Sequence, residues 1–261
     1  MTQLLGRRCC YSRGGPHSQA GVTLIELLIA VSLMSLLTVG IVYAMRLAIN
    51  SQERANKKMM ANRRVTGAQR ILEQQVANLV PVLADCRATP VSPPSPVSFF
   101  QGEPQAMRFV STYSLEEAHR GYSQILEYSV IAGENNMGFR LLVNELLYSG
   151  ARSTGALCLG NSFDQALGVS RTLFRPIEPG PRSFVLADKL ASIRFLFREQ
   201  LPAGNPQMVR DRWVPLWTKP ELPTGIRIEM TPLEASPGTL HVMTVTAPVR
   251  ITIDPMRKQI E

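Results

Sequence analysis

The sequence predicts an α+β protein in which a long N-terminal helix packs on an antiparallel β-sheet head. The first observation is a stretch from Val22 to Val80 that contains no proline and begins with an apolar run. The second is the i+3/i+4 spacing of apolar residues near the end of this stretch, which is typical of a helix with one buried face. The third is a series of short segments beyond Phe99 in which apolar and polar residues alternate, as they do in half-buried strands.

Residues 1–21 have the composition of a targeting segment. They carry three arginines and no acidic residue, and they end at Gly21. An ordinary secretory signal places a small-residue cleavage site after an apolar region of about 7–15 residues. Here the apolar run is about twice that length, and the small residue precedes it. We therefore expect a leader peptide that ends at Gly21.

Residues 22–45 are expected to form the membrane-spanning half of the helix, and residues 46–83 its amphipathic, soluble half. The first half carries a single charge, Glu26. At about 1.5 Å per residue it spans roughly 36 Å, enough to cross a hydrocarbon core of about 30 Å. Pro81 predicts that the helix stops near Val80. The expected buried face of the second half consists of Ala61, Val65, Ala68, Leu72, Val76 and Leu79, with Asn56, Arg63, Arg70 and Gln74 opposite.

Residues 84–98 are rich in proline and are expected to form an extended linker, followed by a β-rich head over residues 99–254. A hairpin is predicted around the turn at 133–138, because strand-like segments flank it on both sides. The expected strands are 108–113, 125–131, 139–143, an alternating segment around 193–198, another at 226–231, and a last pair within 240–253 that is broken at Pro248.

The net charge of +8 does not indicate a nucleic-acid partner. Residues 80–261 carry 18 basic and 17 acidic side chains, so the head is nearly neutral and the excess lies in the leader and the helix. A nucleic-acid-binding protein normally concentrates positive charge on its folded face. No nucleic-acid partner is therefore expected.

Cys86 and Cys158 lie in the predicted head, and two interpretations of them remain open. In an oxidising compartment they can form a disulfide bond, which would close a loop worth roughly 4 kcal/mol in the chain-entropy model. Alternatively, they are two unrelated buried thiols.

The sequence lacks the motifs of the common enzyme classes, and we expect no catalytic residue, no metal site and no cofactor. There is no Gly-rich phosphate loop, no H-E-x-x-H and no G-x-S-x-G. His119 and His241 are explained by ordinary loop and strand positions. Trp213 and Trp217, four residues apart, are assigned to core or edge packing rather than to a ligand platform.

Glu26 is the candidate functional residue of the helix. A carboxylate within a membrane span costs about 2.5 kcal/mol or more at the bilayer centre, so such residues are usually functional. If the chain is cut after Gly21, a new α-amino group appears at Val22, at nearly the same depth. An amine and a carboxylate of neighbouring subunits could then pair and offset both charges in lipid.

The sequence Gly21-Val22-Thr23-Leu24-Ile25-Glu26 with its apolar run resembles the N-terminal signature of type IV pilins and type II secretion pseudopilins. The resemblance implies that a prepilin peptidase cuts between Gly21 and Val22 and N-methylates Val22, and that Glu26 acts in subunit assembly. It also implies a pilin-like fold. Val22 departs from the signature, in which Phe or Met is commoner at this position.

Four further segments are similar to those of the minor pseudopilins of the J type: Arg70–Ala77, Ile193–Phe197, Trp213–Trp217 and Leu222–Ile228. The resemblance implies a non-enzymatic subunit at the tip of the pseudopilus, where it starts assembly and supports protein export. The implied partners are the minor pseudopilins of the I and K types, the major pseudopilin, the prepilin peptidase and the inner membrane. The alternatives are a minor type IV pilin that primes or caps a surface pilus, and a membrane-tethered periplasmic enzyme or binding domain.

The orientation in the membrane has two opposing indications. Three basic residues precede the apolar run and six follow it within about 20 residues, so charge counting alone places the head in the cytoplasm. The family resemblance implies the reverse, with the leader in the cytoplasm and the head in the periplasm of a bacterium. We adopt the second orientation as the expectation.

Overall fold

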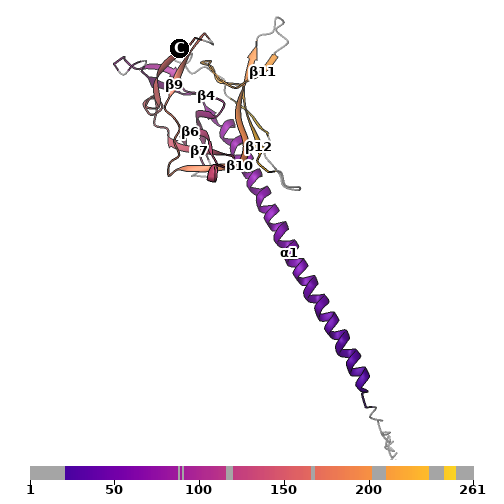
Figure 1. Ribbon diagram of the computed structural model, residues 1–261. Helices are drawn as coiled ribbons and strands as arrows, with labels where there is room; N and C mark the ends of the chain where they lie inside the picture. Colours follow the sequence, from indigo (N-terminus) through magenta and orange to yellow (C-terminus); the bar gives the residue numbers. More distant parts are fainter. Residues whose placement is uncertain are drawn as a thin grey trace, which may run out of the picture. The chain divides into compact units, whose positions relative to one another are not determined.

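The computed structural model describes residues 21–87, 89, 91–115, 120–165, 168–201, 210–234 and 244–250. These residues contain one long helix, a nine-stranded antiparallel sheet and two two-stranded ribbons (Figure 1). The predicted α+β architecture, a long N-terminal helix followed by an antiparallel sheet, is confirmed. The chain divides into two compact units at Asn56, and the helix runs through the division.

The main sheet has the strand order β1-β5-β6-β7-β10-β12-β13, with β4 added beside β5 and β11 beside β10. The ribbons are β2-β3 and β8-β9. The helices are α1 (Leu24–Ala77), η1 (Glu134–Asn136) and α2 (Ala151–Gly155). The strands are β1 (Leu79–Val80), β2 (Leu83–Cys86), β3 (Ser95–Ser98), β4 (Gln101–Gly102), β5 (Ala106–Tyr113), β6 (Arg120–Ala132), β7 (Phe139–Leu147), β8 (Cys158–Asp164), β9 (Val169–Phe174), β10 (Ser183–Leu201), β11 (Arg210–Val214), β12 (Gly225–Pro232) and β13 (Thr244–Pro248).

The last turns of α1 pack on the sheet through the face that its periodicity predicts. Leu72 and Val76 are 0% and 1% exposed and belong to the main core, with Phe109, Phe195 and Tyr128 of the sheet. Earlier in the amphipathic half, the predicted apolar positions are only half-buried. The buried face of α1 therefore begins around Ala68 and covers only the end of the helix.

The predicted hairpin is confirmed as β6 and β7, which pair from Gln124–Leu147 to Ala132–Phe139. The turn between them holds Asn135 and Asn136 at φ of 53° and 60°, and Gly138 at 67°. A Cβ on Gly138 would lie 2.6 Å from the carbonyl oxygen of Leu190. Glycine is required there both by its left-handed conformation and by this close approach.

The alternating segments are confirmed as parts of β10 and β12. Ile193, Phe195 and Phe197 face the core at 4%, 0% and 0% exposure, while Arg194 between them is exposed. Ile226, Ile228 and Met230 of β12 are buried on the same side of the sheet. The period of two residues thus identified the inward-facing side chains.

The helix ends at Ala77, slightly before Val80, where Pro81 was expected to stop it. Asn78 closes its end, since both the backbone N–H and the side-chain Nδ2 of Asn78 donate to the carbonyl of Gln74, at 3.1 and 2.7 Å. Leu79 and Val80 then pair with β5. Pro81 disfavours the α conformation at Val80, and the sheet edge offers backbone partners instead.

The segment 84–98 is not the extended linker that its prolines suggested. Its two ends pair as strands β2 and β3, from Leu83–Ser98 to Cys86–Ser95. Pro96 lies inside β3, whose described neighbour in the ribbon is β2 alone. A proline lacks a backbone donor, so it is tolerated in a strand that has a free edge.

Other strands have no counterpart in the sequence prediction. β10 runs for 19 residues, although only its second half alternates, and the β8-β9 ribbon is short and rich in polar residues. Of the predicted last pair, Thr244–Pro248 forms β13 beside β12. Residues 240–243 and 251–253, His119, His241 and residues 1–20 of the leader lie outside the described residues.

Candidate processing and assembly site

The bond between Gly21 and Val22 lies just before the first turn of α1. Thr23 is the N-cap of the helix: its carbonyl accepts from the N–H of Leu27 at 3.2 Å, and its Oγ1 accepts from the N–H of Glu26 at 3.4 Å. The capping role of Thr23 is visible in the sequence as the T-x-x-E pattern of a capping box at 23–26. The cap leaves the Gly21–Val22 bond in non-helical backbone.

Gly21 is not required by the fold of the described chain. A Cβ added there would meet no atom within 4 Å, and its φ is not in the left-handed region. The neighbouring Val22 is 72% exposed. The bond between Gly21 and Val22 is therefore not covered by the described residues.

Glu26 lies in the first turn of α1, where the positive end of the helix dipole favours a carboxylate. Within the described part of the chain, no group forms an ion pair or hydrogen bond with this carboxylate. Glu26 is thus placed favourably by its own helix but is not neutralised by it.

The side chains around Glu26 form an apolar surface. From Val22 to Ile49 every large apolar side chain is at least 48% exposed. α1 is the one helix of the described residues that is long and apolar enough to cross a membrane. Burying such a surface in lipid or against similar helices is strongly favourable.

Three hydroxyl groups of the apolar segment are satisfied within the helix itself. Ser32, Ser35 and Thr38 donate to backbone carbonyls three or four residues earlier, at 2.9, 2.8 and 2.7 Å. These bonds spare the hydroxyl groups the cost of burial without a partner. The Glu26 carboxylate forms no such bond with the described residues.

Cys86 and Cys158 are joined by a disulfide bond, with 5.5 Å between their Cα atoms. The bond ties β2 to the start of β8 across 72 residues. Nearby, Thr154 of α2 donates to the carbonyl of Leu83 at 3.0 Å, which holds α2 against β2. Of the two interpretations left open by the sequence, the structure contains the bridged one. The bond lies in the head, away in sequence from Gly21, Val22 and Glu26, which stand together at the start of α1.

A buried polar network fastens α1 to the sheet, and sequence analysis missed it. Gln75 is fully buried, its Nε2 donates to Glu145 Oε1 at 3.1 Å, and its Oε1 accepts from the Tyr128 hydroxyl. Glu145 also accepts from Ser114 Oγ at 2.8 Å and from the N–H of Leu115 at 2.7 Å. Burial, and secondly the charge of Glu145, raises the pKa of Tyr128 well above its usual value, so the phenol stays a donor.

The other residues singled out from the sequence have packing roles. Trp217 packs against the main core and its Nε1–H donates to the carbonyl of Glu221 at 2.7 Å. The ring of Trp213 lies 4.1 Å from the guanidinium carbon of Arg227. Both arrangements agree with the predicted core or edge packing.

Among the described residues, no group of three or more His, Cys, Asp and Glu side chains has the arrangement of a metal site.

Comparison with known proteins identifies the same N-terminal region. Residues 16–42 match the family model described as "Prokaryotic N-terminal methylation motif", which is a type IV pilin-like prepilin signal. The match covers Gly21, Val22, Glu26 and most of the apolar run, and it does not extend into the head. No curated protein matches the chain significantly.

Proposed function

We propose that this chain is a minor pseudopilin of a type II protein secretion system, acting by assembly rather than by catalysis. The observation that carries the proposal is the unpaired carboxylate of Glu26 in a membrane-length helix that directly follows a prepilin signal. A simple membrane anchor has no use for such a charge, whereas the hydroxyl groups of Ser32, Ser35 and Thr38 in the same segment are satisfied within the helix.

The proposed assembly step begins with cleavage between Gly21 and Val22. Cleavage creates an α-amino group at Val22, and methylation of this amine preserves its positive charge. Glu26 of one subunit then pairs with the amine of its neighbour at a similar depth in the membrane. An unpaired charge within a membrane span is unfavourable, by about 2.5 kcal/mol or more at the bilayer centre and by less toward the surface, so pairing favours the assembled state.

The disulfide bond supports a periplasmic head and a cytoplasmic leader. Disulfide bonds persist in the bacterial periplasm and are rare in the cytosol. The Cys86–Cys158 bond therefore weighs against the cytoplasmic head that charge counting alone favours. We place the protein in the bacterial inner membrane as a single-pass protein with this orientation.

The resemblance to the J type is supported by how its segments pack. Leu72 and Val76 of the helix end, Phe195 of β10 and Ile226 and Ile228 of β12 all belong to one core. Val214 and Trp217 pack against the same core, so all four similar segments share a single packing unit, as expected for a common fold of the head. On this basis we propose the minor pseudopilins of the I and K types, the major pseudopilin and the prepilin peptidase as partners.

A deletion strain tests the proposed system. We expect loss of secretion of a type II substrate with normal surface pili, and restoration of secretion by the full-length gene. Normal secretion together with loss of surface pili would contradict the proposal and favour a minor type IV pilin. Normal secretion and normal pili would contradict both and favour a tethered enzyme or binding domain.

A further inference from the structure

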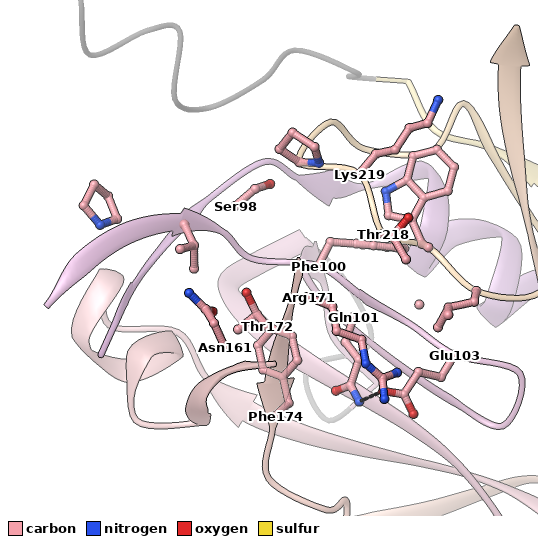
Figure 2. Close-up of a pocket in the computed structure, with 16 residues that line it drawn as sticks. Ser98, Phe100, Gln101, Glu103, Asn161, Arg171, Thr172, Phe174, Thr218 and Lys219 are labelled. Atoms are coloured by element: carbon pink, nitrogen blue, oxygen red, sulfur yellow. Dashed lines mark hydrogen bonds between the residues drawn. The ribbon is translucent and has the colours of Figure 1, made fainter. Parts of the chain in front are cut away.

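A pocket of about 280 Å³ lies in the head, between the two ribbons and the main sheet (Figure 2). β3 contributes Ser98, β9 contributes Arg171 and Phe174, and the segment 216–220 contributes Trp217 and Lys219. Small-molecule sites usually have about 300–1,000 Å³. The pocket is therefore suited to one side chain with part of its backbone rather than to a larger ligand.

Two of the charged side chains that line the pocket already have partners. Lys219 Nζ lies 2.5 Å from Glu199 Oε1, and the pKa of Glu199 is held low, first by this contact and then by Arg212. Glu103 Oε1 accepts from Gln101 Nε2 at 3.1 Å. These contacts bind the two groups to the protein's own side chains.

Arg171 differs from these groups. Its side chain makes no hydrogen bond or ion pair with any of the described residues, and its Nε is buried without a hydrogen-bond partner. Ser98 Oγ, also in the pocket wall, is the other buried polar atom with this property among the described residues. A half-buried guanidinium that forms no bonds loses hydration without compensation.

Arg108, close by in the same part of the head, shows how this fold satisfies an arginine. It donates to Glu127 Oε1 at 2.7 Å, to Gln101 Oε1 at 2.5 Å and to the carbonyl of Arg175 at 3.0 Å. Its guanidinium also lies 5.5 Å from the centre of the Phe174 ring. Arg171, on the same strand as Phe174, has none of these contacts. The N–H groups of its guanidinium are therefore available to an acceptor from another molecule.

We propose that this pocket binds a carboxylate presented by another protein, an aspartate or glutamate side chain that Arg171 holds through its guanidinium. The fork of N–H groups matches a planar carboxylate and favours two parallel hydrogen bonds. Phe100, Phe174 and Trp217 supply apolar walls for the methylene groups of the acidic side chain. Glu103 in the same lining repels an anion in proportion to its charge, so a singly charged carboxylate is favoured over a phosphate. The proposal does not depend on the secretion role.

The test uses the full chain in detergent micelles and blocked amino acids as probes. The sequence has two tryptophans, so Trp213→Phe leaves Trp217 of the pocket as the single reporter. We expect N-acetyl-glutamate methylamide to change its fluorescence saturably, and the glutamine analogue and inorganic phosphate to bind at least tenfold more weakly. Arg171→Gln should weaken glutamate binding at least tenfold, whereas Arg171→Lys should retain part of it.

Arg194→Gln is the matched control, because Arg194 is exposed, pairs with Glu229 at 2.6 Å and does not line the pocket. It should bind the glutamate probe as the parent does. Circular dichroism and thermal unfolding check that each variant is folded. Equal binding of glutamate and glutamine, equal or tighter binding of phosphate, unchanged binding by a folded Arg171→Gln, or the absence of any saturable response would each overturn the proposal.

Discussion

Gln75 of α1 and Glu145 of β7 meet inside the head, with 3.1 Å between Nε2 and Oε1 and exposures of 0% and 2%. The contact links residues 70 positions apart. Apolar packing alone tolerates small rotations of a helix, but a directed hydrogen bond between buried groups does not. The pair therefore fixes which face of α1 packs on the sheet, and it fixes the position of the helix along its own axis.

Gln75→Leu should lower the free energy of unfolding of the head by about 1–3 kcal/mol. The substitution keeps the volume, but the Tyr128 hydroxyl loses its acceptor and Glu145 loses one donor. Chemical denaturation of the full chain in detergent, followed by tryptophan fluorescence, measures the change. Gln69→Leu is the control, because Gln69 is exposed and bonds only along the helix to Glu73. Equal stability of the two variants would show that the network does not stabilise the packing of α1 on the sheet.

Cys158→Ser should lower the stability of the head by roughly 4 kcal/mol, because the bond closes a long loop. The wild-type protein should run faster on a non-reducing gel than on a reducing one, and the variant should lose this difference. Thiol alkylation before denaturation provides an independent measurement. Free thiols at both Cys86 and Cys158 in protein taken from membranes would refute the bond and with it the main support for a periplasmic head.

Glu127→Gln should destabilise the head by about 3 kcal/mol or more, because it leaves a buried guanidinium unpaired. Arg108 and Glu127 are 2.7 Å apart with side chains 1% and 7% exposed, and burial lowers the pKa of Arg108. Glu229→Gln is the matched control: Glu229 pairs with the exposed Arg194, and such pairs contribute about 0–1 kcal/mol. Similar losses of stability in both variants would contradict the conclusion that the buried Arg108–Glu127 pair matters more than an exposed pair.

Gly21→Ala should still be processed in part, whereas Gly21→Leu should retain the leader. The chain itself has room for a Cβ at this position, so a processing defect reports on the peptidase and not on misfolding. N-terminal sequencing of protein extracted from membranes measures the cut directly. A first residue other than Val22 in the wild-type protein would refute the assigned bond, and full processing of Gly21→Leu would remove the role of glycine.

The structure could be predicted from the sequence where apolar residues recur at a regular helical or strand spacing. The spacing of Leu72 and Val76 identified the buried face of α1, and the alternation around Phe195 identified the inward side of β10. The prediction from the sequence failed where the local preference of a residue was overridden by a tertiary contact. Pro96 suggested a linker, but the ribbon with β2 accepts a proline at its edge.

The residues of the candidate site also divide into those that local sequence identifies and those that depend on distant contacts. Gly21, Val22 and Glu26 are local in sequence, so their motif could be recognised without a fold. Gln75 looked like an ordinary polar helix residue, because its partner Glu145 lies on a distant strand and neither residue signals the other. Arg171 is similar: its lack of partners is a property of three dimensions and has no counterpart in sequence spacing.

The central claim is that the Glu26 carboxylate couples neighbouring subunits. Glu26→Gln retains the shape of the side chain and removes its charge, so leader removal and membrane insertion should remain normal. Loss of pairing leaves the neighbour's amine uncompensated in lipid, at a cost of up to about 2.5 kcal/mol, or up to roughly 60-fold in the assembly equilibrium. Glu53→Gln is the control, because Glu53 is an exposed helix charge beyond the apolar segment.

Site-specific crosslinking to partner pseudopilins in membranes, with secretion assayed in the same strains, is the most direct measurement. The account predicts processed and inserted Glu26→Gln protein with little crosslinking and little secretion, and Glu53→Gln protein indistinguishable from wild type. Wild-type crosslinking and secretion by Glu26→Gln would contradict the pairing and reduce Glu26 to a tolerated charge at the membrane surface.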